Sequence, residues 1–188
     1  AIGQKGPSFR RSFGLMSAPE ERLGHAAAPN MSLIENALIT GIEQQSLQKR
    51  GFLDWQKTRV FADDIISRFD VRTNSATNAA RSLSGGNLQK FVIGREVVQN
   101  PQVLVVNQPT WGVDAAAAAS IRQALFDLAG NGSAVIVISQ DLDELMEISD
   151  RFAALNVGEL SEIIPTGDLS MEQIGLMMGG AKSMDIVQ

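Results

Sequence analysis

A short turn rich in serine and glycine carries the clearest chemistry in the sequence. It reads Leu83-Ser84-Gly85-Gly86-Asn87 and precedes a stretch with the composition of a helix. Two adjacent glycines let the backbone approach a phosphate group closely, and the Ser84 hydroxyl adds a hydrogen-bond donor. The positive N-terminal end of the following helix would then face the anion. The turn therefore indicates a phosphate contact, although a Ser/Gly cap on an ordinary helix would have the same sequence.

Other polar residues with possible roles follow short apolar runs. The run Val103 to Val106 predicts a strand buried on both faces, and Asn107 and Gln108 come directly after it. A second buried strand is expected over 134–138, and Ser139-Gln140-Asp141 follows it. Helical segments separate these strands, and this alternation predicts a parallel α/β sheet.

The elements that must position these residues differ between the two halves of the chain. The first half is expected to be mostly helical after a loop over residues 1–12 and a short strand over 13–16. Ser32 with Glu35 fits a capping box, and Asp54 and Asn87 are expected at or beside helix starts. The second half alternates strand and helix. The expected helices cover 31–39, 54–69, 87–98, 115–128, 141–148 and 171–178, and a hairpin is expected over 152–164.

Composition excludes several classes of site. The chain has 188 residues, a formal net charge of −5 and no cysteine, so disulfides and cysteine-ligated metals are excluded. The only histidine is His25, which excludes a multi-histidine metal site within the chain. The acidic balance argues against a nucleic-acid partner. No apolar run approaches the roughly 18–20 residues of a membrane span. We expect a cytoplasmic protein whose membrane link comes through a partner.

These motifs resemble those of the ABC ATPases. The segment Ser82 to Lys90 resembles their signature motif. Val103 to Asp114 resembles their Walker B strand followed by the D-loop, with Asp114 in the place of the D-loop aspartate. Ser139-Gln140-Asp141 resembles their switch region. The three segments occur in the family's order and at appropriate spacing, so the resemblance extends over nearly the whole chain.

The N-terminal part narrows the resemblance. Gly14 to Arg22 occupies the place of the Q-loop, and Met31 to Asn36 follows it. Both look like the second nucleotide-binding domain of duplicated importers for simple sugars or nucleosides, and Asn87 after two glycines fits the same group. Glu20 and Arg22 would line the Q-loop, which couples to the membrane domain; a solvated charged loop is an equal alternative.

The resemblance implies a fold and its divisions. We expect an α/β, P-loop NTPase-like (ABC ATPase) three-layer domain that is incomplete and carries an inserted helical subdomain. Residues 1–26 and 101–166 would form the α/β core. Residues 27–100 would form the helical subdomain with the signature helix, and 167–188 a C-terminal helix.

The sequence departs from the family pattern at its phosphate loop. Gly-x-x-x-x-Gly-Lys-Ser/Thr, the Walker A motif, does not occur in the 188 residues. Gly179-Gly180-Ala181-Lys182-Ser183 is a decoy, since its lysine follows alanine and it lies near the C-terminus. The phosphate loop should precede the Q-loop, so we expect a domain that lacks its first strands and its own phosphate loop.

Three further positions depart from the family pattern. Asn107 stands where an aspartate supports Mg²⁺, and a neutral amide cannot supply that charge. Gln108 stands where a glutamate polarises the attacking water, and Gln140 replaces the switch histidine; an amide orients water but is not a useful base. Drift at unimportant positions would explain each one separately, whereas all three together indicate a degenerate hydrolytic site. The residues that would face a partner domain's ATP keep the family pattern: Ser84, Gly85, Gly86, Asn87 and Asp114.

The resemblance implies an ATP-binding subunit, or a fragment of one, from an ABC importer for a sugar or nucleoside. Its partners would be a second ABC nucleotide-binding domain and a membrane permease, at the inner face of the cell membrane. ATP and Mg²⁺ would bind the full-length dimer, and no nucleotide is expected on this chain alone. Exposed sheet edges predict self-association. The alternative is a catalytically inactive ABC-like interaction module that binds no nucleotide.

Overall fold

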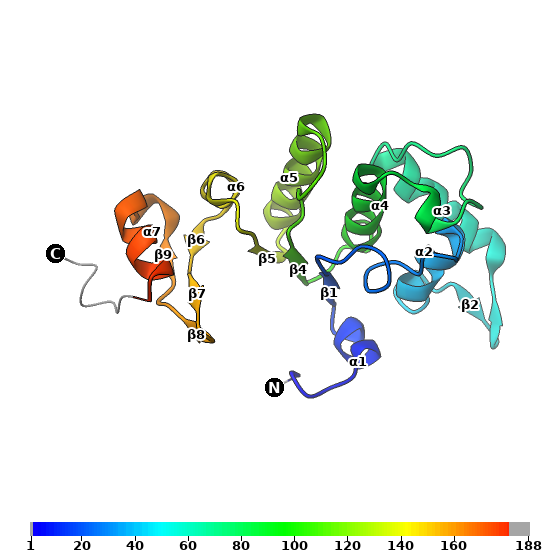
Figure 1. Ribbon diagram of the computed structural model, residues 1–188. Coiled ribbons are helices and arrows are strands. Elements are labelled where there is room, and N and C mark those ends of the chain that lie inside the picture. The colour runs from blue at the N-terminus through cyan, green and yellow to red at the C-terminus, as the bar shows by residue number, and fades with distance from the viewer. Residues whose placement is uncertain (1, 181–188) are drawn as a thin grey trace. The chain divides into compact units, whose positions relative to one another are not determined.

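The computed structural model describes residues 2–180 and divides into two compact units, Ala1–Ile138 and Ser139–Gln188 (Figure 1). Each unit has its own cluster of buried apolar side chains. The first unit contains α1 (Pro7–Ser12), β1 (Leu15–Ala18), α2 (Leu33–Gly41), β2 (Gln48–Lys49), β3 (Phe52–Leu53), α3 (Trp55–Arg68), η1 (Ala80–Ser82), α4 (Gly85–Val97), β4 (Val103–Asn107), α5 (Ala115–Gly130) and β5 (Ala134–Ile138).

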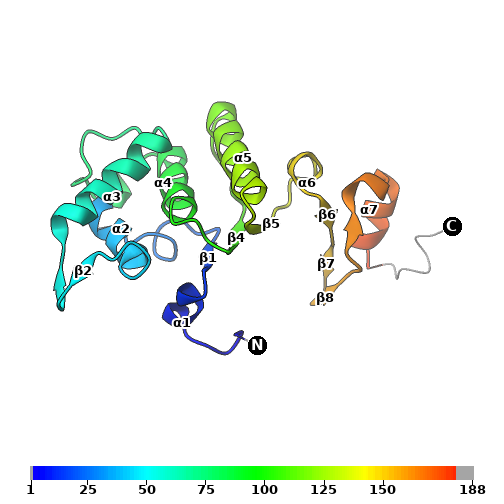
Figure 2. The ribbon, with the colours of Figure 1, turned by 180° about the vertical axis from the view of Figure 1, so that it is seen from behind.

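A three-stranded parallel sheet forms the centre of the first unit, with strand order β1-β4-β5. Leu15 pairs with Val103, and Val103 pairs with Ala134, so the three strands start in register. Helices α4 and α5 lie side by side next to this sheet in both views (Figures 1 and 2). The parallel α/β sheet expected from the alternating pattern is confirmed.

The two faces of the sheet differ in burial. Met16, Leu104 and Val106 point to one face and are packed in the main core with residues of α4 and α5. On the alternate positions, Ile136 and Ile138 of β5 are 52% and 50% exposed. The expectation that the strand over 134–138 is buried on both faces is therefore wrong. Side chains alternate along a strand, and the helices named above cover the Leu104 face only.

Helices α2, α3 and α4 pack together in the segment that connects the adjacent strands β1 and β4. Their starts follow from local capping. Ser32 and Glu35 form the capping box of α2, and the Asp54 carboxylate accepts a hydrogen bond from the Lys57 N–H at 2.9 Å at the start of α3. Asn36 is fully buried, and its Nδ2 donates to the carbonyl of Ala28 at 3.1 Å, which fixes the preceding loop on α2.

A buried ionic cluster joins α1 to α4. Glu96 is 0% exposed and accepts hydrogen bonds from Arg95 Nε at 2.9 Å and from Arg11 Nη2 at 2.8 Å. Arg95 also donates to the carbonyls of Asn36 and Ala26, so its charge has partners on several sides. The loop expected over residues 1–12 is thus wrong in part. Pro7 suits the first position of a helix, and Arg11 anchors that helix to the core.

The second unit contains α6 (Leu142–Ile148), β6 (Arg151–Phe152), β7 (Leu155–Asn156), β8 (Glu159–Leu160), β9 (Ile164–Pro165), η2 (Thr166–Asp168) and α7 (Met171–Met178). Strands β7 and β8 pair antiparallel across the turn Val157-Gly158, which confirms the expected hairpin. Ser170 caps α7 with a capping box, and Ile174 and Met177 of that helix pack in the second core.

Several expected boundaries move by a few residues. Helix α4 begins at Gly85 instead of residue 87, because Ser84 takes the capping position ahead of both glycines. In the decoy motif, Ala181-Lys182-Ser183 lies outside the described residues. No helix within residues 2–180 is long and apolar enough to cross a bilayer.

Candidate functional site

The serine–glycine turn lies at the exposed start of α4. Ser84 is the capping residue, and its Oγ accepts hydrogen bonds from the Asn87 N–H at 3.4 Å and from Asn87 Nδ2 at 2.9 Å. Asn87 Oδ1 in turn accepts from the Arg72 N–H at 2.8 Å. The first N–H groups of a helix have no partner within the helix, so they are available to an anion at this end.

The second candidate segment is the loop between β4 and α5. Gln108 has a φ of +52°, and its N–H donates to the Ile138 carbonyl at 2.7 Å, which anchors the loop to the end of β5. The Trp111 N–H donates to the Gln108 carbonyl at 3.2 Å and closes a turn. Asp114 ends the loop as the cap of α5, where its carboxylate accepts from the Ala117 N–H at 2.9 Å.

The Asp114 carboxylate is stabilised in its charged form. The hydrogen bond from the Ala117 N–H holds the pKa of Asp114 below its ordinary value, and the nearby Ala116 N–H and the positive charge of Lys90 act in the same direction. Partial loss of hydration opposes them. Asp114 is therefore an exposed, ionised acceptor at neutral pH.

The structure brings the two segments together. A Cβ placed on Gly86 would lie 3.8 Å from the Cβ of Val113, the residue before Asp114. One turn further along α4, Gln89 Nε2 donates to the carbonyl of Pro109 at 2.8 Å and to that of Gln108 at 3.3 Å. The helix starts that carry Ser84 and Asp114 thus belong to one packed region.

Sequence reasoning missed the residues that join these segments. Arg22 was expected in the Q-loop or in a solvated loop, and Gln89 was not singled out within the signature motif. In the structure Arg22 Nε donates to Gln89 Oε1 at 3.0 Å, and Arg22 Nη2 donates to the Trp111 carbonyl. A buried glutamine on the inward side of α4 is the signal that points to a polar contact, since a buried amide needs partners.

The positions that depart from the family pattern lie in different places. Asn107 is the last residue of β4 and pairs with Ile138, and Gln108 follows it with only 7% of its surface exposed. Both therefore adjoin the loop that leads to Asp114. Gln140 belongs to the second unit, is exposed, and precedes the Asp141 cap of α6. An amide at any of these positions hydrogen-bonds water but does not take its proton.

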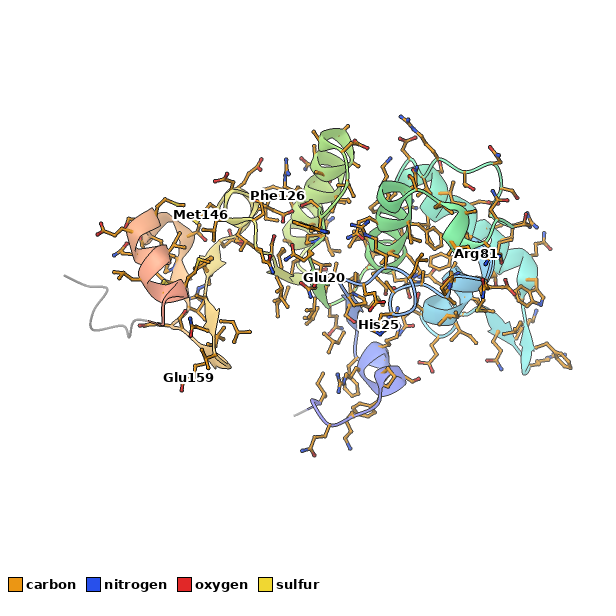
Figure 3. All side chains as sticks on the ribbon, in the orientation of Figure 1. Glu20, His25, Arg81, Phe126, Met146 and Glu159 are labelled. Carbon is orange, nitrogen blue, oxygen red and sulfur yellow. The ribbon has the colours of Figure 1, made fainter. Side chains whose placement is uncertain are left out.

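Charged side chains in the loop after β1 form local contacts. His25 Nδ1 lies 2.9 Å from Glu21 Oε2, with both side chains exposed. Figure 3 shows Glu20 and His25 in this loop. No group of three or more histidine or carboxylate side chains suited to a metal ion occurs within residues 2–180.

Known proteins with similar sequences are import ATP-binding proteins. No family model matches the chain. It is 38% identical to a glucose import ATP-binding protein of Haloferax volcanii over 89% of this chain, and 36% identical to a nucleoside import ATP-binding protein of Lactococcus lactis over 86%. A ribose import ATP-binding protein of Bacillus licheniformis is 32% identical over 95% of the chain. The chain spans about a third of the length of these relatives, at 31%, 32% and 36%.

Solved structures with a similar fold are ATP-binding cassettes. A dimeric ATP-binding cassette in a post-hydrolysis state with ADP and Pi superposes with a TM-score of 0.70 at 21% identity, covering 85% of this chain and 66% of that one. A bacterial ABC transporter cassette gives a TM-score of 0.64 over 82% of this chain. The chain has the P-loop NTPase-like fold of these cassettes.

Proposed function

We propose that this chain is part of the ATP-binding subunit of an ABC importer and that it completes an ATP site held by a partner domain. The packing of the start of α4 next to Val113 carries the proposal, because the exposed helix starts at Ser84 and Asp114 then belong to one region of the surface. The relatives are import ATP-binding proteins, and the fold is that of a cassette.

The chemistry of the paired helix starts fits a nucleotide presented from outside the chain. The Ser84 hydroxyl and the first N–H groups of α4 are donors for phosphate oxygens, and the positive end of the helix favours an anion. Asp114 carries a negative charge, so it suits a positively charged or N–H group of the partner domain instead of the phosphate itself. We propose that five residues contact the partner's site: Ser84, Gly85, Gly86, Asn87 and Asp114.

The chain's own hydrolytic positions do not fit Mg²⁺ or a general base. Asn107 offers a neutral amide oxygen where Mg²⁺ prefers a carboxylate. Gln108 and Gln140 orient water at most. ATP bound with Mg²⁺ supplies the reacting phosphate, and in our proposal this chain contributes binding and orientation from Ser84 to Asn87. Hydrolysis would depend on the carboxylates of the partner domain.

The relatives support a proposal for the transported substrate and for the assembly. Glucose, ribose and nucleoside import proteins match the chain at similar identity, so we propose a sugar or nucleoside as the substrate class. A second nucleotide-binding domain and a membrane permease are the proposed partners, and the location is the cytoplasmic face of the membrane. We propose neither a nucleic-acid partner nor a metal ion held by this chain alone.

ATP hydrolysis by the complete importer tests the proposal. Ser84→Arg places a bulky cation over the exposed start of α4, and we expect it to abolish turnover. Gln108→Glu should change turnover little, since the hydrolytic site of this domain is not used. Ser120→Arg, on the exposed surface of α5, makes the same replacement away from the site and should keep normal activity.

The alternative, an inactive interaction module, gives a different result in the same assay. A module that never meets nucleotide would leave ATP turnover equally unaffected by Ser84→Arg and Ser120→Arg. Strong activation by Gln108→Glu together with a harmless Ser84→Arg would also contradict our proposal, because the chain would then use its own site.

A further inference from the structure

We infer that Arg22 is a positioning residue that fixes the loop 108–113 against the start of α4, so that Ser84 and Asp114 move as one body. Its functional meaning depends on the proposed function above. The residue lies in the loop after β1, far in sequence from both segments that it joins. Its test in the isolated chain needs no nucleotide.

The guanidinium group of Arg22 contacts both segments at once. Its Nε donates to Gln89 Oε1 on α4 at 3.0 Å, and its Nη2 donates to the carbonyl of Trp111 in the loop. A guanidinium is planar and holds its donors in a fixed fork, so two contacts in different directions restrain both acceptors relative to each other. A lysine has no equivalent fork.

Gln89 extends this link into the interior. Its side chain is 1% exposed, its Oε1 accepts from Arg22, and its Nε2 donates to the carbonyls of Pro109 and Gln108. Each end of the amide therefore has partners, and reversing the amide would break the contacts at both ends. Arg22 and Gln89 together bind the loop through carbonyls at Gln108, Pro109 and Trp111.

Two glycines make room for the guanidinium. A Cβ on Gly85 would lie 2.8 Å from Arg22 Nη1, which is closer than Cβ contacts in proteins, and a Cβ on Gly112 would lie 3.3 Å from Nη2. Gly112 also has a φ of +63°, a conformation that disfavours side chains. Gly85 of the serine–glycine turn thus leaves room for the Arg22 guanidinium, in addition to the close approach of a phosphate proposed above.

Arg22 connects the loop after β1 to the residues at the candidate site. The loop that carries it resembles the Q-loop, for which coupling to the membrane domain and a solvated charged loop were equal alternatives. Movement of this loop would pull on the Trp111 carbonyl and on Gln89 together. The residues at Ser84 and Asp114 would then shift jointly instead of separately.

Fluorescence of the isolated chain tests the positioning role. The sequence has two tryptophans, so Trp55→Phe leaves Trp111 as the only reporter, directly at the carbonyl that Arg22 binds. In this background we expect Arg22→Gln to raise the amplitude of the fast component of the anisotropy decay about twofold, because a freed loop moves on the nanosecond timescale. Arg81→Gln is the matched control, because Arg81 is exposed and lies three residues before Ser84. It should leave the anisotropy decay unchanged.

A second variant keeps Arg22 and places a methyl group where its guanidinium lies. Gly85→Ala should displace the guanidinium and mobilise Trp111 in the same way, with the melting temperature monitored to confirm folding. An unchanged anisotropy decay in both Arg22→Gln and Gly85→Ala, or an equal change in Arg81→Gln, would overturn the inference.

The complete importer then tests the consequence for turnover. We expect Arg22→Gln to lower kcat more than it raises KM for ATP, and Arg22→Lys to recover only part of the loss, because an ammonium cannot span both acceptors. Normal kcat in Arg22→Gln, in an assembly that Ser84→Arg inactivates, would refute joint positioning while the proposed function stands. A harmless Ser84→Arg would refute the proposed function instead.

Discussion

Asn87 restrains Ser84 directly, since Asn87 Nδ2 donates a hydrogen bond to Ser84 Oγ at 2.9 Å. The other end of the same amide, Oδ1, accepts from the Arg72 N–H at 2.8 Å. One side chain therefore links the serine that is proposed to face nucleotide to the loop that follows α3. The residue after the two glycines has a structural task in addition to any contact with a ligand.

Asn87→Ala should destabilise the first unit. It removes two hydrogen bonds at a partly buried position, and we expect the free energy of unfolding to fall by about 1–2 kcal/mol. Urea unfolding followed by circular dichroism measures the change. Asn30→Ala, at an exposed asparagine in a loop, is the control and should have little effect. Equal stability of the two variants would contradict the link through Asn87.

Local signals explain why the sequence predicted most elements of the fold. Four helices are capped by a side-chain oxygen that accepts a hydrogen bond from the backbone N–H three residues later, so the nearby sequence contains the whole interaction. The capping residues are Ser32, Asp54, Asp114 and Ser170. The apolar strand over 134–138 was predicted with its observed boundaries. Its burial was predicted wrongly, because burial depends on which elements cover each face of the sheet.

The contacts that assemble the candidate site could not be predicted in this way. Arg22 and Gln89 are separated by 67 positions, and no local pattern specifies that they meet. The resemblance assigned Ser84 and Asp114 to the same partner ATP site, but it did not identify the contacts that hold their segments together. Only the packing of α4 against the loop before α5 shows that Val113 lies next to the space where a side chain on Gly86 would stand.

Glu96→Gln should be strongly destabilising. Glu96 is 0% exposed and lies between Arg95, whose side chain is 3% exposed, and Arg11. Removing its charge leaves buried Arg95 without a counter-ion, and loss of one partner of a buried pair costs about 3–5 kcal/mol. Guanidinium chloride unfolding measures this cost.

A surface ion pair provides the matched control for Glu96. Asp64→Asn breaks the exposed pair with Arg68 on α3, where Nε and Oδ1 lie 2.8 Å apart. We expect a loss below about 1 kcal/mol, because exposed pairs contribute little. Similar losses for Glu96→Gln and Asp64→Asn would contradict a larger contribution of the buried cluster to stability.

The exposed face of β5 predicts association between copies of the chain. Ile136 and Ile138 lie on the same face of that strand and are about half exposed, at 52% and 50%. Ile136→Lys should raise the dissociation constant of the self-associated species about tenfold, since burial of an isoleucine is lost and a charge is introduced. Light scattering over a concentration series measures it.

Phe126 serves as the control for this association. It is exposed on α5 and is labelled in Figure 3. Phe126→Lys removes comparable apolar surface elsewhere on the first unit and should leave association unchanged. A chain that is monomeric at every concentration, or that responds equally to both substitutions, would exclude β5 as the contact.

The cap of α5 makes stability depend on pH in a defined window. Hydrogen bonding to the Ala117 N–H holds the pKa of Asp114 below its ordinary value in the folded chain. A carboxyl group with a lowered folded-state pKa stabilises the fold fully above its unfolded pKa of about 3.9, and this contribution is lost as the pH falls through the folded-state pKa. Asp114→Asn keeps a capping oxygen but does not titrate.

We therefore expect the melting temperature of the wild type to exceed that of Asp114→Asn by a constant margin between pH 7 and pH 5. The charged carboxylate interacts favourably with the positive end of the helix, in addition to its capping hydrogen bond. The margin should shrink below about pH 4 as Asp114 takes up its proton. Asp114→Ala, which loses the cap itself, should melt roughly 2–4 °C lower at neutral pH. Differential scanning calorimetry from pH 3 to pH 7 measures all three proteins. A margin between the wild type and Asp114→Asn that widens on acidification would refute the lowered pKa, since protonation would then favour the folded state.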